Sequence, residues 1–152
     1  PAEQKPAAPV TEQKPAAPAE SNGATGSYEA QVVDLVNKER AAQGLSALKY
    51  NAELSKVAEA KAADLRDKNY FSHTSPTYGS PFDMMKSFGI SYTAAGENIA
   101  KGYMSPASVM DGWMNSPGHK ANIMNGNFTE IGVGYVSGDN GTGYWVQMFI
   151  RP

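Results

Sequence analysis

Two histidines are the side chains of this chain best suited to acid–base or metal chemistry. His73 lies in the segment 70–76 and His119 in the segment 115–122, both of which are polar and rich in turn-forming residues. Imidazole titrates near neutrality and ligates zinc or copper, so two imidazoles that met in space would form a candidate metal site. The local context of each histidine nevertheless favours a surface or helix-capping position, and their separation in sequence does not show whether they meet.

Two acidic residues stand beside glycine-containing apolar segments. Glu97 follows Gly96 and precedes Asn98 and Ile99, so it is either an exposed residue on a strand edge or an inward-facing carboxylate that needs a partner. Glu130 precedes a similar apolar segment but follows a loop, which favours a solvated position. Neither pattern identifies a catalytic acid.

Nucleophiles are scarce in this sequence. Cysteine is absent, which excludes thiolate catalysis, disulfides and cysteine-ligated zinc. Ser116 stands three residues before His119, but a serine before proline is more simply a turn or a helix N-cap. Ser72 is a similarly weak candidate. The sequence contains no G-x-S-x-G, Walker A, H-E-x-x-H or EF-hand motif, so no established catalytic template applies.

The elements that must position these residues are helices first and strands later. Apolar residues at helical spacing, with N-cap and C-terminal glycine signals, predict two long helices over 27–43 and 51–68. Two shorter helices are expected to begin at Ser80-Pro81, ending near Gly89, and at Ser105-Pro106. Alternating apolar residues predict a hairpin of strands over 130–136 and 143–150, with a turn at 138–141 and a further strand over 92–100. This order predicts an α+β fold with helices packed on an antiparallel sheet.

Composition divides the 152 residues into a short first segment and one domain. Residues 2–10 (AEQKPAAPV) and 11–19 (TEQKPAAPA) form a nine-residue repeat with nothing large to bury. We therefore expect residues 1–26 to be a disordered Pro/Ala-rich segment, either a spacer after an anchoring module or an ordinary tail. Residues 27–152 would form the folded domain.

Charge and hydropathy argue against several classes of partner. The formal net charge is −2, from 13 basic and 15 acidic residues, so no strong field would attract nucleic acid or an anionic membrane. No run of 18 apolar residues occurs, so no transmembrane segment is expected in this chain.

Four motifs occur in order along the chain: Phe71-Ser72-His73, Gly96-Glu97-Asn98-Ile99-Ala100, Trp113 to Ile123, and Ile131 to Tyr135 followed by Tyr144 to Phe149. Together they resemble the CAP superfamily, which groups cysteine-rich secretory proteins, antigen 5 and pathogenesis-related 1 proteins and is also called the SCP domain. The resemblance covers about residues 28–151 and is closest to the cysteine-free bacterial branch. It implies an α-β-α sandwich with a central antiparallel sheet flanked by helices, in a secreted or cell-wall-associated protein.

The same resemblance implies a cleft lined by two histidines and two acidic residues. His73, Glu97 and His119 match three of these positions, as cleft residues and as ligands of a divalent metal such as zinc. The position of the second glutamate is Ser116 here. Asp111, Glu130 or a water molecule are the alternatives for the place of that acid, although no motif supports any of them.

Two functions are compatible with this cleft. The first is a binding module at the cell envelope, which holds a divalent metal or a polar ligand between the two histidines and Glu97. The alternative is a peptidase-like hydrolase that acts on peptide or cell-wall polymer, with a histidine or Glu97 as general base. The absence of a strong nucleophile favours binding over catalysis. A structural envelope protein with a relict cleft is a third hypothesis.

Overall fold

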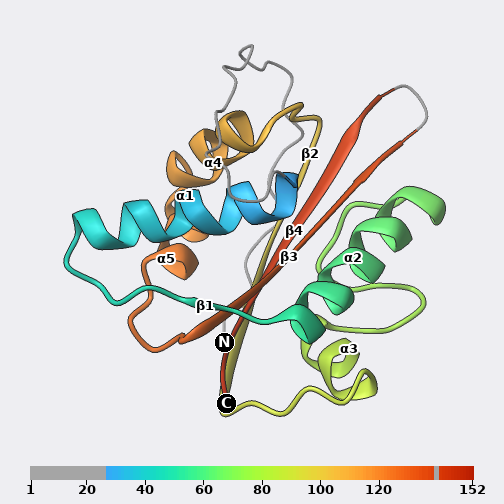
Figure 1. Cartoon of the computed structure of the whole chain (residues 1–152). Coiled ribbons are helices and arrows are strands. Elements are labelled where there is room, and N and C mark those ends of the chain that lie inside the picture. Colours follow the sequence, from blue (N-terminus) through green and yellow to red (C-terminus); the bar gives the residue numbers. More distant parts are fainter. Residues whose placement is uncertain (1–26, 139–140) are drawn as a thin grey trace.

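A computed structural model describes residues 27–138 and 141–152. The predicted spacer at residues 1–26 and the middle of the predicted turn at 138–141 lie outside the described residues. Within them, helices and strands occur in the order α1, β1, α2, α3, β2, α4, α5, β3 and β4 (Figure 1).

Three helices begin at the N-cap serines that the sequence predicts, and the helix expected from about residue 51 begins after an Asn51 cap. The N-cap side chains Ser27 and Asn51 accept hydrogen bonds from main-chain N–H groups in the first turn, and Ser80 and Ser105 form capping boxes. Glycines with positive φ follow the ends of the first and third helices, as expected. The bounds are α1 Tyr28–Ala42, α2 Ala52–Asp67, α3 Pro81–Ser87 and α4 Pro106–Met114.

A fifth helix, α5 (Pro117–Ile123), lies where the sequence analysis found only turn-forming residues. Its first turn contains proline and glycine, and it is too short to show an apolar period, so local pattern does not distinguish it from a turn. Ser116 is its N-cap by backbone conformation, but the serine side chain makes no capping hydrogen bond. The two-residue strand β1 (Lys49–Tyr50) was also missed, because it is shorter than any alternating pattern.

The sheet has four strands in the order β1-β3-β4-β2. The predicted hairpin is confirmed as β3 (Glu130–Ser137) and β4 (Gly143–Arg151), and the third predicted strand as β2 (Ala94–Lys101). β2 and β3 each pair with β4 in antiparallel register, whereas the short β1 pairs with β3 in parallel. The strand β2, which carries Glu97, is therefore at one edge of the sheet.

Helices cover both faces of this sheet. α2 and α3 lie on one face, and α1, α4 and α5 lie on the other (Figure 1). Alternate side chains of β4 enter the two resulting cores: Val146 and Met148 pack with α2, and Trp145 and Phe149 pack with the opposite helices. The predicted α+β sandwich is confirmed.

Two glycines of β3 bring α2 unusually close to the sheet. A Cβ atom built on Gly132 would lie 2.4 Å from the main chain of Leu54, and one on Gly134 would lie 2.3 Å from that of Ala58. Only a residue without a side chain permits such an approach. The helix α2 is thus held against the sheet before the chain turns into the loop that carries His73.

Of the helices in the described part of the chain, none has the length and apolar composition needed to cross a membrane.

Candidate functional site

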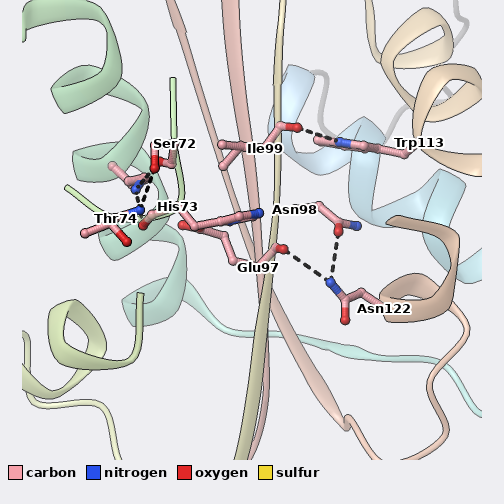
Figure 2. A network of polar contacts seen from close by, with 9 residues as sticks. Ser72, His73, Thr74, Glu97, Asn98, Ile99, Trp113 and Asn122 are labelled. Carbon is pink, nitrogen blue, oxygen red and sulfur yellow. Dashed lines mark hydrogen bonds and ion pairs between the residues drawn. The ribbon is translucent and has the colours of Figure 1, made fainter. Parts of the chain in front are cut away.

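The site lies at the outer edge of β2, where the two helical layers meet. The main-chain N–H of Gly102, just after β2, donates to the carbonyl of Gly143 in β4. Even-numbered residues of β2 therefore direct their main-chain N–H and C=O groups toward β4, and odd-numbered residues direct theirs outward. The indole N–H of Trp113 donates to the Ile99 carbonyl (3.2 Å), and the Asn122 amide donates to the Glu97 carbonyl (3.2 Å). Figure 2 shows these contacts on one side of β2 and the His73 loop on the other.

Glu97 faces inward and has a partner, which decides between the two positions that its sequence left open. The residue is 2% exposed, and its Oε1 lies 2.7 Å from Nδ1 of His73. When a carboxylate accepts this hydrogen bond, Nδ1 carries the proton, and Nε2 of the neutral ring then holds the lone pair. Glu97 therefore fixes both the orientation and the tautomer of His73.

His119 approaches from α5, in the opposite helical layer. Its Nδ1 lies 2.8 Å from Oγ of Ser116, and its main-chain carbonyl accepts from the Asn98 amide (3.0 Å). His119 is 4% exposed, and His73 is 6% exposed. The local prediction that both histidines lie at the surface was wrong, because their burial depends on elements far apart in sequence.

Burial determines the protonation state of His119. Loss of solvent, together with a smaller effect of repulsion from a charged His73, lowers the pKa of His119 from 6.5 to about 4. His119 is therefore neutral at pH 7.

Three buried polar atoms of this site have no hydrogen-bond partner: Nε2 of His73, Nε2 of His119 and Oε2 of Glu97. Within the part of the chain that the structure describes, they are the only buried side-chain nitrogen or oxygen atoms in this condition. Because folded proteins satisfy nearly all such atoms, these three atoms are the natural contacts for a ligand bound beside β2.

The donor atoms are compatible with a metal ion, but not with a closed protein cage. Two neutral imidazole nitrogens suit zinc and similar divalent cations. No three His, Asp or Glu side chains in residues 27–138 and 141–152 are grouped closely enough to hold a metal ion. A metal here would thus be held by Nε2 of His73 and Nε2 of His119, with Glu97 acting through the imidazole of His73.

The other candidate acids lie elsewhere. Glu130 begins β3, and its Oε1 accepts from the side chain of Asn51 at the start of α2 (2.8 Å). Asp111 is exposed on α4. The structure joins His73 to Glu97 and His119 to Ser116 by side-chain hydrogen bonds, and neither pair includes Glu130 or Asp111.

Sequence reasoning missed two kinds of residue around the site. Asn98 and Asn122 join β2 to α5 through a hydrogen bond between their side-chain amides (2.9 Å), and Asn98 is completely buried. Lys61 is completely buried beneath the His73 loop. A signal for Lys61 was present: it interrupts the apolar stripe of α2 between Ala58 and Ala62.

Comparison with known proteins identifies relatives of this chain. The chain is 54% identical over 143 residues to Uncharacterized protein YkwD of Bacillus subtilis (strain 168), a match that covers 94% of this chain and 54% of that protein. A crystal structure of an extracellular protein containing an SCP domain, from Bacillus anthracis str. Ames, is 35% identical with a TM-score of 0.78. It covers 82% of this chain and 40% of that one, so the chain spans about half the length of these relatives.

A more distant structure shares the fold. An outer surface protein from Borrelia burgdorferi is 23% identical with a TM-score of 0.73, covering 79% of this chain and 89% of that chain. The family described as "CAP: Cysteine-rich secretory protein family" matches residues 33–149, which is more than half of this sequence. The chain therefore belongs to the cysteine-rich secretory protein (CAP) family.

Proposed function

We propose that this domain is a binding module of a secreted or surface protein, and that it holds a divalent cation of the zinc type at the outer edge of β2. Nε2 of His73 and Nε2 of His119 are the protein ligands, and solvent or a polar ligand completes the coordination. Glu97 orients His73 and supplies negative charge close to the cation.

The group of unpartnered buried atoms is the observation that supports this proposal. Each imidazole has one nitrogen engaged, with Glu97 or with Ser116, and the other nitrogen free. This is the arrangement of metal-ligating histidines in proteins, whose second nitrogen is held by a neighbouring polar group. The low pKa of His119 also supports the proposal, since a neutral imidazole does not have to lose a proton before it coordinates.

The location proposed for the protein rests on its relatives. The Bacillus anthracis neighbour is described as extracellular, and the Borrelia burgdorferi protein is described as an outer surface protein. We infer a similar location here.

Calorimetric titration with zinc tests the proposal. We expect the wild type to bind zinc at about pH 7.5, and His119→Ala to weaken binding by at least about tenfold, which is the smallest effect expected even for an outer-shell partner. Glu97→Gln should weaken binding too. Glu130→Gln is the matched control, because Glu130 lies outside the site, and it should bind like the wild type. Equal affinities for all four proteins would contradict the proposal.

The pairing of His73 with Glu97 also favours a second candidate function, a hydrolase. A histidine held at 2.7 Å by a carboxylate is the arrangement of a general base and its orienting group, and a water molecule would then be the nucleophile. Ser116 is a weaker candidate nucleophile. It contacts Nδ1 of His119, but among the described residues no carboxylate contacts Nε2 of that ring to orient it. Hydrolysis of peptide or cell-wall polymer that is abolished in Glu97→Gln would favour this candidate over binding alone.

A further inference from the structure

A buried lysine lies directly behind the first histidine of the site. Lys61, in the middle of α2, is 0% exposed, and its ammonium group donates to the main-chain carbonyls of Ser72 (3.0 Å) and His73 (2.7 Å). The ammonium also lies over the ring of Tyr70, 5.3 Å from its centre. Every one of these contacts is with the loop that carries His73.

Asp64, one turn further along α2, holds the rest of the same loop. Its carboxylate accepts hydrogen bonds from the hydroxyl groups of Tyr70 (2.7 Å), Ser75 and Thr77 (3.0 Å). The main chain of Ser75 pairs with that of Gly79 in both directions, which closes the loop upon itself. Lys61 and Asp64 are three residues apart and therefore lie on one face of the helix.

Packing alone does not explain a charged residue at position 61. Burial lowers the pKa of the Lys61 ammonium, while the nearby Glu97 and Asp64 carboxylates oppose that shift. A buried ammonium is costly unless its hydrogen bonds are well made, and an apolar side chain of similar volume often stabilises a core equally well. The two carbonyls of Ser72 and His73 are the feature that an apolar residue could not satisfy.

We propose that Lys61 is the positioning residue for His73. Its ammonium fixes the main chain of His73 from one side while Glu97 fixes the imidazole from the other, so that Nε2 faces the same ligand as His119. Asp64 supports Lys61 by holding residues 70–77 in place. The role in binding rests on the proposed function, but the control of the His73 orientation does not depend on any ligand.

Three variants at lysine positions of α2 test this proposal. Lys61→Met keeps the volume and removes the donor, whereas Lys61→Arg keeps a cation that can donate to both carbonyls. Lys56→Met is the matched control, because Lys56 is exposed on the same helix and forms an ion pair with Glu53 (3.9 Å). The readouts are the side-chain ¹⁵N signals of His73 by NMR without ligand, and zinc affinity by calorimetry.

We expect Lys61→Met to shift the His73 signals and to weaken zinc binding about tenfold, with Lys61→Arg closer to the wild type and Lys56→Met unchanged. A folded Lys61→Met protein with unshifted His73 signals would overturn the proposal, and so would equal disturbance by Met and Arg. If the wild type binds no zinc, the proposed function fails while the NMR signals still test the positioning.

A further variant, at a different residue, covers the case in which Lys61→Met does not fold. Thr77→Val removes one hydroxyl that binds Asp64 at the partly exposed side of the loop and leaves Lys61 intact. We expect smaller shifts of the same His73 signals. A folded Thr77→Val protein with wild-type His73 signals would overturn the role given to Asp64 and its loop.

Discussion

At the scale of single residues, the site uses one nitrogen of each imidazole to hold the ring and leaves the other nitrogen free. Glu97 engages Nδ1 of His73, and Ser116 engages Nδ1 of His119. Two rings from opposite helical layers thus present chemically equivalent nitrogens at the edge of one strand. The unpartnered Oε2 of Glu97 adds an acceptor to the same group of atoms.

The first prediction concerns the pH dependence of the His119 contribution to metal binding. An ordinary imidazole near pKa 6.5 would lose affinity between about pH 7.5 and pH 5.5. Because the pKa of His119 is lowered to about 4, this ring stays neutral across that range. We therefore expect the ratio of zinc affinities between the wild type and His119→Ala to stay constant from about pH 7.5 to 5.5 and to shrink only below about pH 5.

Calorimetry in buffers of equal ionic strength measures this ratio. Both proteins retain His73 and Glu97, so the ratio reports the contribution of His119. A ratio that collapses between about pH 7 and 6 would show that His119 titrates like an exposed histidine.

The chemistry of single residues could be predicted from sequence better than their surroundings. The motif resemblance identified His73, Glu97 and His119, all of which are buried: His73 is hydrogen-bonded to Glu97, and the main chain of His119 accepts from Asn98. Local context, however, placed both histidines at the surface, since neither stands on an apolar stripe. Each histidine is buried because a loop or a short helix packs against the edge of β2. The local sequence around a histidine does not specify such a long-range contact.

At the scale of elements, start and stop signals predicted most of the framework. Ser27, Ser80 and Ser105 cap helices as expected, since capping depends on a few adjacent residues. Helix α5 was missed because its stability comes from tertiary contacts: the Asn122 side chain donates to the Glu97 main chain and to Asn98.

The contact between α2 and β3 supplies the second prediction. Gly134→Ala would place a Cβ atom 2.3 Å from the main chain of Ala58, which cannot move without displacing the helix. We expect a loss of about 1–3 kcal/mol or more in the free energy of unfolding, as for other overpacked cores. Gly126→Ala is the control, because its Cβ would meet only Leu45 at an ordinary 3.8 Å. Urea unfolding measures both, and equal stability of the two variants would show that α2 adjusts freely.

The third prediction concerns the carboxyl group that links α1 to α2 and β3. Burial, together with the hydrogen bond and charge of Glu59, raises the pKa of Glu29 from 4.5 to about 8, although the N–H of Tyr135 opposes the shift. The folded state thus holds a proton that the unfolded state releases, so this group's contribution to stability falls as pH rises from about 4.5 to 8.

Glu29→Gln keeps the size of the side chain and its ability to form hydrogen bonds, but it removes the ionisable carboxyl group. We expect its melting temperature to fall less than that of the wild type between about pH 5 and pH 9. Glu53→Gln, at an exposed position of α2, is the matched control and should follow the wild type. Parallel pH profiles for Glu29→Gln and the wild type would contradict a raised pKa.

At the scale of the whole molecule, the candidate site lies at the β2 edge of the sheet, whereas β1 and β3 form the opposite edge. Strand β4 is paired on both sides, and β1 pairs with only a short part of β3. Strand β2 pairs with β4 on one side, and side chains of α4 and α5 contact its main chain on the other. The ligand site that we propose therefore lies where both helical layers meet the edge of β2. Sequence pattern predicted helices packed on an antiparallel sheet, and the motif resemblance implied helices on both faces, but neither predicted how the His73 loop and α5 lie against β2.

The fourth prediction concerns residues 1–26, which lie outside the described residues. The sequence offers no large apolar side chain in this segment, so its removal should cost no buried surface. We expect the melting temperature of residues 27–152 to match that of the whole chain within experimental error. A fall of several degrees would show that the segment packs against the domain.

The central claim is that the two free imidazole nitrogens belong to one binding site. Long-range ¹H–¹⁵N NMR spectra of the histidine side chains during a zinc titration test it most directly. We predict that the Nε2 signals of His73 and His119 shift together and stop shifting at one equivalent of zinc, while both Nδ1 nitrogens keep the signature of their hydrogen bonds. Shifts of only one ring, or of the two rings at different zinc ratios, would contradict a shared site.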